Sequence, residues 1–161
     1  MQPVSVMLTL CEAGESQKKR DTYDNEFLRK AKIRILAYKN AFDGIWTPEE
    51  IRQAKLKGNI AKGYNVHHIR PLGTEESTFD LDNMVVMDRR SHTWLHREIY
   101  DPALSLCQVG KRCAIWLPEM DVNKVIRWQD IEEFVKEYTE YRKKYYGGVN
   151  VPRRNTTAES R

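Results

Sequence analysis

The stretch "NVHHIRPLGTEESTFDLDNMVVMDRRSHTWLHR", residues 65–97, contains all four histidines of the 161-residue chain. They form two pairs: His67 and His68 are adjacent, and His92 and His96 are four residues apart. An imidazole can bind a metal ion or transfer a proton near neutral pH, so the clustering indicates a functional site. What each ring can do depends on the local fold of this stretch.

Two short strands and a helix are predicted here. "GYNVHH" at 63–68 and "MVVM" at 84–87 favour strands, and the loop between them carries turn residues. Asp88 is a suitable N-cap for a helix that we expect to run to about Tyr100 and to end before Pro102. The histidines are thus predicted on a strand–loop–strand–helix unit.

The two histidine pairs differ in their expected geometry. Residues four apart on a helix share one face, with Cβ atoms about 5–6 Å apart, so His92 and His96 can converge on one divalent ion. Adjacent strand residues point to opposite faces, so His67 and His68 cannot easily reach the same ion. We therefore expect three histidines to bind a metal that keeps an open coordination position, and one to act as a general base. The helical spacing alone is also common among ordinary surface histidines.

Asn83 directly precedes the second strand. Its side-chain amide can bond to backbone groups across the loop and hold the two short strands in register. An ordinary turn residue would explain Asn83 equally well from sequence alone.

The flanking segments are predicted to be mainly helical. Apolar residues recur at helical spacing from about 24 to 40, and Thr47 caps a second helix that Gly58 closes. After the histidines we expect a turn at Gly110, a strand that continues through Trp116, and a long helix. That helix covers about 129–146 and is ended by Gly147 and Gly148.

These elements predict an α+β fold, with a small two-stranded ββα unit embedded in a mainly helical single domain of residues 1–161. Residues 1–20 are expected to be irregular. The four tryptophans are expected in the core or at its edge, and Trp94 is expected to pack the histidine helix onto the body of the domain. The parts are a helical N-terminal segment (22–58), the ββα core (about 62–100), a C-terminal strand and helix (107–147), and a disordered tail (149–161).

Composition limits the classes of function. The 27 basic and 23 acidic residues give a net charge of +4, which permits binding to a polyanion without establishing it. The chain has no apolar run long enough to span a membrane, and its N-terminus does not resemble a signal peptide. Cys11, Cys107 and Cys113 have no disulfide or zinc spacing, so we expect three free thiols in a reducing compartment.

The histidine stretch resembles the HNH, or ββα-metal, nuclease motif in the form found in colicin and pyocin DNases and in polymorphic-toxin nuclease domains. The resemblance covers about 31 residues and includes a tandem His-His, a proline three residues later, an Asp-x-Asp-Asn-apolar segment and a helical His-x-x-x-His. The matching residues here are His67-His68, Pro71, Asp80 to Met84, and His92 with His96, followed by Arg97.

The resemblance implies a role for each matching residue. His67, His92 and His96 would bind one divalent ion, which could be zinc, nickel, magnesium or manganese. His68 would be the general base that activates water, and Asn83 would constrain the loop and orient that base.

The chain departs from the family in two places. The acidic residue that precedes the tandem histidines in colicin-type DNases is replaced by Val66 or Asn65, so its phosphate-holding arginine partner is not identified. Among the nearby arginines we favour Arg70 and Arg90 as phosphate contacts. In addition, about 65 residues follow the motif, whereas the colicin motif helix nearly ends the chain.

The expected function is a metal-dependent endonuclease that cleaves DNA with little sequence specificity, as an antibacterial toxin or effector domain with an acidic immunity protein as partner. Such a protein would be cytoplasmic when made and, as an effector, would be delivered into a target cell. The alternatives are a phage or mobile-element HNH endonuclease, an RNase that uses the same site, and a non-catalytic nucleic-acid-binding module stabilised by metal.

Overall fold

The computed structural model describes residues 2–12 and 25–146 and has an α+β architecture. A three-stranded sheet of β2 (Tyr64–His68), β3 (Met84–Asp88) and β5 (Val125–Ile126) lies at its centre, with strand order β2-β3-β5. β2 and β3 are antiparallel, whereas β3 and β5 are parallel. The predicted hairpin of two strands is therefore confirmed, but β5 adds a third strand that the two-residue apolar run did not reveal.

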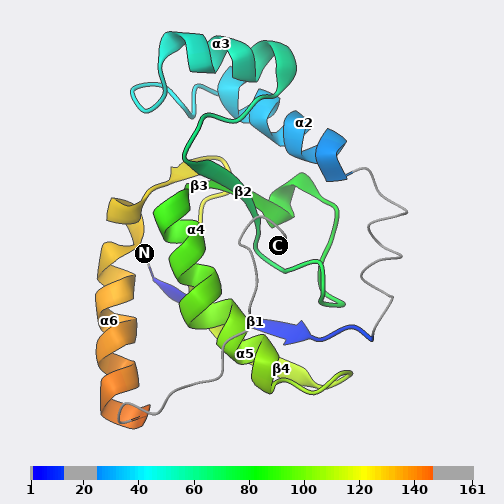
Figure 1. The fold of residues 1–161 in the computed structure, drawn as a ribbon, viewed down its shortest axis with the longest axis vertical. Helices are drawn as coiled ribbons and strands as arrows, with labels where there is room; N and C mark the ends of the chain where they lie inside the picture. The colour runs from blue at the N-terminus through cyan, green and yellow to red at the C-terminus, as the bar shows by residue number, and fades with distance from the viewer. Residues whose placement is uncertain (1, 13–24, 147–161) are drawn as a thin grey trace.

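Both faces of the central sheet are covered, and β3 is consequently buried along almost its whole length. Val85 and Met87 pack into one hydrophobic core, and Met84 and Val86 pack into the other. α2 (Asn25–Tyr38) and α3 (Pro48–Lys57) cover one face, and the helix that follows β3 covers the other (Figure 1). Neighbouring residues of β2 and β3 consequently point into two different environments.

The helix that carries the histidine pair is longer than predicted. α4 (Arg89–Leu95) passes into a π-helical turn, η2 (His96–Tyr100), and then into α5 (Asp101–Leu106). The end predicted near Tyr100 is wrong, because Pro102 falls in the first turn of α5, where a missing N–H is tolerated. The Asp101 N–H donates to the His96 carbonyl, five residues back, so the wider turn lies directly before the proline.

A single carboxylate joins two helices at the edge of the sheet. Asp88 caps α4 as predicted, with Oδ1 accepting from the Ser91 N–H at 2.8 Å. Its Oδ2 accepts from the N–H of Trp128, the first residue of α6 (Trp128–Tyr146), at 2.6 Å. Trp94 then packs edge-on against Phe134 of α6, which confirms that this side chain holds α4 against the body of the domain.

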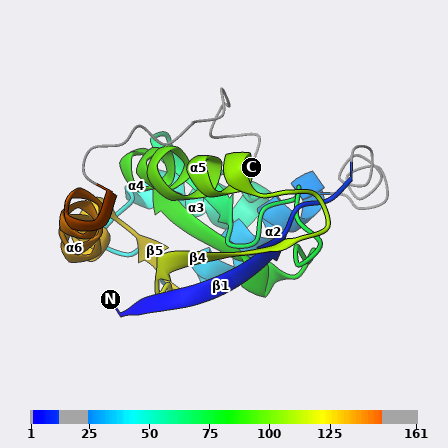
Figure 2. The same cartoon turned by 90° about the horizontal axis from the view of Figure 1, so that it is seen from below.

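A second sheet completes the fold and was not predicted. β1 (Pro3–Thr9) pairs in antiparallel register with β4 (Arg112–Pro118), and the pair lies beneath the α4–α5 run, with α6 at one end (Figure 2). The expectation that residues 1–20 are irregular is wrong for β1, where Val6 and Leu8 face the core and Met7 faces outward. The same alternation leaves Trp116 of β4 56% exposed, so its predicted place in the core is also wrong.

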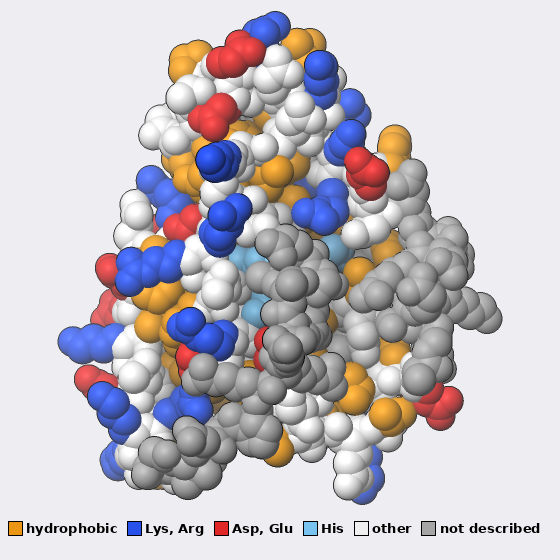
Figure 3. Space-filling view, in the orientation of Figure 1, with side chains coloured by type: hydrophobic (Ala, Val, Ile, Leu, Met, Phe, Trp, Pro, Cys, Tyr) orange, Lys and Arg blue, Asp and Glu red, His pale blue; other side chains and the backbone are white. Residues whose placement is uncertain are grey.

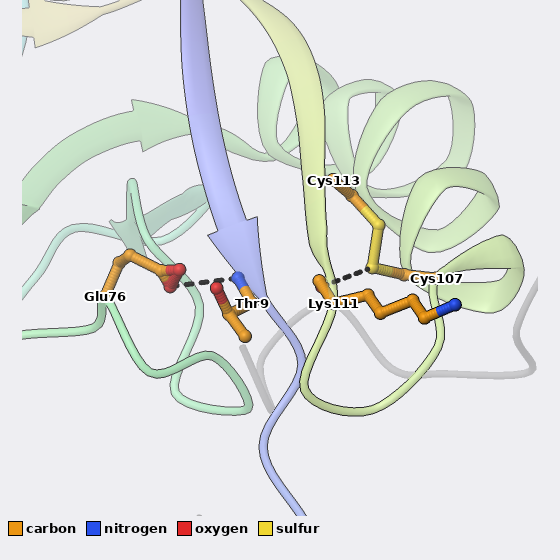
Figure 4. The surroundings of a disulfide bond; sticks show 5 residues. All are labelled: Thr9, Glu76, Cys107, Lys111 and Cys113. Atoms are coloured by element: carbon orange, nitrogen blue, oxygen red, sulfur yellow. Dashed lines mark hydrogen bonds between the residues drawn. A yellow bond between two sulfur atoms is a disulfide. The ribbon is translucent and has the colours of Figure 1, made fainter.

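The cysteines correct a further expectation. Cys107, just after α5, forms a disulfide with Cys113 in β4, across a turn in which Gly110 has φ 79° (Figure 4). Cys11 is buried and lies outside the disulfide, as predicted. The prediction of three free thiols fails because the turn brings together two cysteines whose sequence separation of six matches no recognised motif. The inference of a reducing compartment loses its support.

The remaining predicted elements are largely confirmed. Thr47 and Glu50 form a capping box at the start of α3, and Gly58 ends that helix in the left-handed conformation. The helix predicted over 24–40 is α2, and the one predicted over 129–146 is α6. The glycine stop at 147–148 and the tail at 149–161 lie outside the described residues. Among the helices described, none has the length and apolar character needed to cross a membrane.

Candidate metal centre

Three of the four histidines meet in the interior between β2 and α4. His67, His92 and His96 are 0%, 1% and 3% exposed, and one ligand nitrogen from each lies within 4.8 Å of the others. The Nε2 atoms of His92 and His96 are 3.1 Å apart. The predicted convergence of these three residues is confirmed.

The donor set suits a single divalent ion. Two nitrogens that each lie about 2.0–2.1 Å from a tetrahedral zinc ion are roughly 3.3–3.4 Å from one another, close to the His92–His96 separation. Burial, and then the neighbouring His96 and His92, hold the pKa of His67 well below its usual range. A neutral imidazole is the form that can donate a lone pair to a metal. These observations show a cluster that could hold a metal ion, and they do not select the element.

Tyr100 determines which nitrogen of His67 is free to bind. Its hydroxyl donates to the Ile69 carbonyl at 2.7 Å and lies 3.0 Å from Nε2 of His67. Burial raises the pKa of Tyr100, so the hydroxyl keeps its one hydrogen, and that hydrogen is already used. The hydroxyl must therefore accept from the Nε2–H of His67. This leaves the lone pair of a neutral His67 on Nδ1, a buried atom with no hydrogen-bond partner among the residues described.

Tyr100 was not predicted to be part of the site, although its spacing in the sequence indicated it. Tyr100 follows His96 by four residues, just as His96 follows His92. The rings of His67 and Tyr100 have centroids 5.1 Å apart, and those of His96 and Tyr100 are 5.2 Å apart. A continued four-residue series on one helix face could have placed the tyrosine beside the histidines.

His68 points to the other side of β2, as adjacent strand residues must. It is 2% exposed, and its Nε2 lies 3.2 Å from Oδ1 of Asn25, the first residue of α2. The predicted division between a ring in the cluster and a ring outside it is therefore present. Asn25 was not predicted to take part, because nothing in the sequence relates the start of α2 to a strand some 40 residues later.

Asn83 holds the loop between β2 and β3, as its position predicted. Its Oδ1 accepts from the Arg70 N–H at 2.8 Å, and its Nδ2 donates to the carbonyls of Arg70 at 3.0 Å and Thr78 at 3.1 Å. All three bonds are to backbone, so one amide fixes both ends of the loop. The loop backbone that follows His68 is thereby held in place.

The two favoured arginines lie in different places. Arg70 has an exposed side chain, and its positive charge opposes the rise that burial causes in the pKa of Tyr100. The guanidinium of Arg90 instead stacks on Trp128, with Cζ 4.0 Å from the ring centroid. Because Arg90 also lies about half a helix turn around α4 from His92, the structure does not bring it to the histidines.

No protein-family model, curated protein or solved structure matches this chain. The resemblance to HNH nucleases therefore rests on the motif residues themselves.

Proposed function

We propose that this protein is a metal-dependent endonuclease of the HNH class, and that it hydrolyses phosphodiester bonds in DNA. The observation that supports this best is the separation of the four histidines by strand β2, with three buried rings gathered on one side and the fourth on the other. A purely structural metal site has no use for a fourth imidazole next to three ligands.

In the proposed mechanism His67, through Nδ1, together with His92 and His96 would hold one divalent ion. When bound, the ion would offset negative charge on the transition state and stabilise the leaving 3′ oxygen. Histidine surface is visible at the centre of the face shown in Figure 3, with Lys and Arg side chains above it, toward α2 and α3. A surface of this charge suits contacts with phosphate.

His68 would take the proton from the attacking water. The Asn25 amide limits the rotation of its ring, and Asn83 holds the backbone that leads away from it. Arg70 would contact the phosphate, because its side chain is exposed and its charge acts on Tyr100, which contacts His67. Arg90 is not part of this proposal, since its guanidinium stacks on the ring of Trp128.

The biological setting that we propose is an antibacterial toxin or effector domain. Its producer would then need an acidic immunity protein that covers the basic face around the histidines. This setting rests on the motif resemblance alone, and an HNH endonuclease of a phage or mobile element would use the same residues.

The decisive experiment incubates the purified protein with supercoiled plasmid, linear duplex, single-stranded DNA and tRNA in the presence of zinc, nickel, magnesium or manganese, with EDTA as control. We expect cleavage of DNA that requires a metal and stops in EDTA. Cleavage of tRNA alone would identify an RNase, and binding without cleavage of any substrate would favour the non-catalytic module.

A further inference from the structure

A cleft of about 610 Å³ lies on the His68 side of the central sheet. It is bounded by the first two turns of α2, the segment that follows α3, and strand β2. The lining residues are Asn25, Glu26, Arg29, Lys30, Ile33, Gly58, Asn59, Ile60 and Val66.

The cleft begins next to His68. Asn25, which lies 3.2 Å from the His68 ring, is itself a lining residue. Val66 lies two residues before His68 and therefore on the same face of β2. Arg29 follows Asn25 by four residues, so it lies about one turn further along the same face of α2, about 6 Å away along the helix axis. A ligand that reaches His68 and continues along β2 would meet Arg29.

Arg29 is a charged residue in the lining of this cleft. It is partly buried, and none of the residues described forms a hydrogen bond or ion pair with it. Burial lowers the pKa of Arg29, an effect that the nearby charge of Glu26 only partly opposes. Glu26 also lines the cleft, but its exposed carboxylate is paired with Lys30 at 3.5 Å. A partly desolvated guanidinium that forms no ion pair with the described residues favours an anionic ligand.

We propose that this cleft binds a backbone phosphate of the nucleic acid beside the scissile bond, with Arg29 as its principal ligand. The inference rests on the proposed function, which supplies a polyanion running past His68. The guanidinium can donate two parallel hydrogen bonds to one phosphate. Because the contact is to phosphate, it contributes affinity and register without reading the sequence of bases.

Arg29→Gln and Arg29→Lys test the assignment against a matched control, Arg52→Gln. Arg52 lies on exposed α3 and pairs with Glu49 at 2.8 Å, so its substitution removes the same charge outside the cleft. All three changes are made in His68→Ala protein loaded with metal, and binding to a short labelled duplex and to its single strand is measured by fluorescence anisotropy over a series of salt concentrations. Circular dichroism and thermal unfolding check that each variant is folded.

We expect Arg29→Gln to weaken binding several-fold and to reduce the slope of log K against log salt by about one. Arg29→Lys should restore most of that slope, and Arg52→Gln should leave it unchanged. With His68 intact, Arg29→Gln should raise KM more than it lowers kcat, because the contact is made to bound substrate as well as to the transition state.

Equal effects of Arg29→Gln and Arg52→Gln on binding would overturn the inference. It would also be overturned if Arg29→Gln lost stability, Arg29→Lys did not, and binding stayed the same. If the wild-type protein cleaves DNA but Arg29→Gln behaves like the control, only the phosphate cleft is wrong. If the wild-type protein neither cleaves nor binds nucleic acid, the proposed function fails first.

Discussion

The two faces of strand β2 carry the same side chain in two different settings. On one face His67 is fully buried and lies among His92, His96 and Tyr100, with its pKa well below the usual range. On the other face His68 lies against Asn25 at the start of α2, next to a cleft that is lined by Arg29. The comparison teaches that a step of one residue along a strand places two identical rings in different surroundings, because successive strand residues point to opposite faces. In the proposed mechanism this difference would separate metal binding from proton transfer.

The largest effect is expected from removing the imidazole of His68, on the α2 face of β2. His68→Ala should lower the rate of DNA cleavage by about 10²–10⁴-fold, the usual contribution of a general base. The fold and the metal content should be unchanged, since this ring is not in the cluster. Measuring the cleavage rate and the metal content of the same sample checks both expectations. An undiminished cleavage rate would remove His68 from the mechanism.

A smaller effect is expected from removing the hydroxyl that contacts His67 on the α4 face of β2. Tyr100→Phe removes the acceptor that holds the Nε2–H of His67, and loss of such a partner typically costs about 10–100-fold in metal affinity. Competition with a chelating dye would measure the affinity, and cobalt(II) absorption would report the ligand set. Tyr138→Phe is the matched control, because the Tyr138 hydroxyl bonds to the Glu98 carbonyl away from the cluster. Equal metal affinity in Tyr100→Phe and wild type would contradict the tautomer argument.

The loop that joins the two faces offers a third test. Asn83→Ala leaves the Arg70 N–H and two carbonyls without their side-chain partner, at a cost of about 1–3 kcal/mol in the free energy of unfolding. Cleavage should fall as well, because the backbone after His68 is no longer held. Urea unfolding and cleavage assays measure the two effects. Asn83→Asp should lose stability as well, because it replaces the buried donor to the Arg70 and Thr78 carbonyls with a second acceptor. A variant as stable as wild type would show that the loop does not depend on this amide.

The smallest effect is expected from substitution of Arg90, whose guanidinium stacks on Trp128. Arg90→Gln removes a cation–π contact with Trp128 that is worth about 0.5–1 kcal/mol at an exposed site. Cleavage should stay within about twofold of wild type, since a contact worth so little lies far from the chemistry. A loss of cleavage well beyond twofold would mean that Arg90 reaches the substrate after all.

Much of the site was predictable because its pattern is local. Spacing on one helix and alternation on one strand are properties of short segments, and they placed His92 with His96 and separated His67 from His68. Asn83 followed from the same kind of reasoning, since its partners lie within the loop that it closes.

Two of the features that the sequence did not reveal depend on contacts distant in sequence, and two others are local. Asn25 meets His68 only because α2 packs across the sheet, and β5 is a strand only because β3 offers it an edge. The bond between Cys107 and Cys113 depends on the turn between them, and Arg90 was placed by its sequence distance from His92 although it lies on another face of α4.

Metal titration of wild-type, His67→Ala and His68→Ala protein tests the central claim most directly. Isothermal titration of the metal-free samples with zinc should give one bound ion for wild type and for His68→Ala, and a large loss of affinity for His67→Ala. If His68→Ala loses the ion as His67→Ala does, or if wild type binds none, the two faces of β2 do not divide the work as proposed.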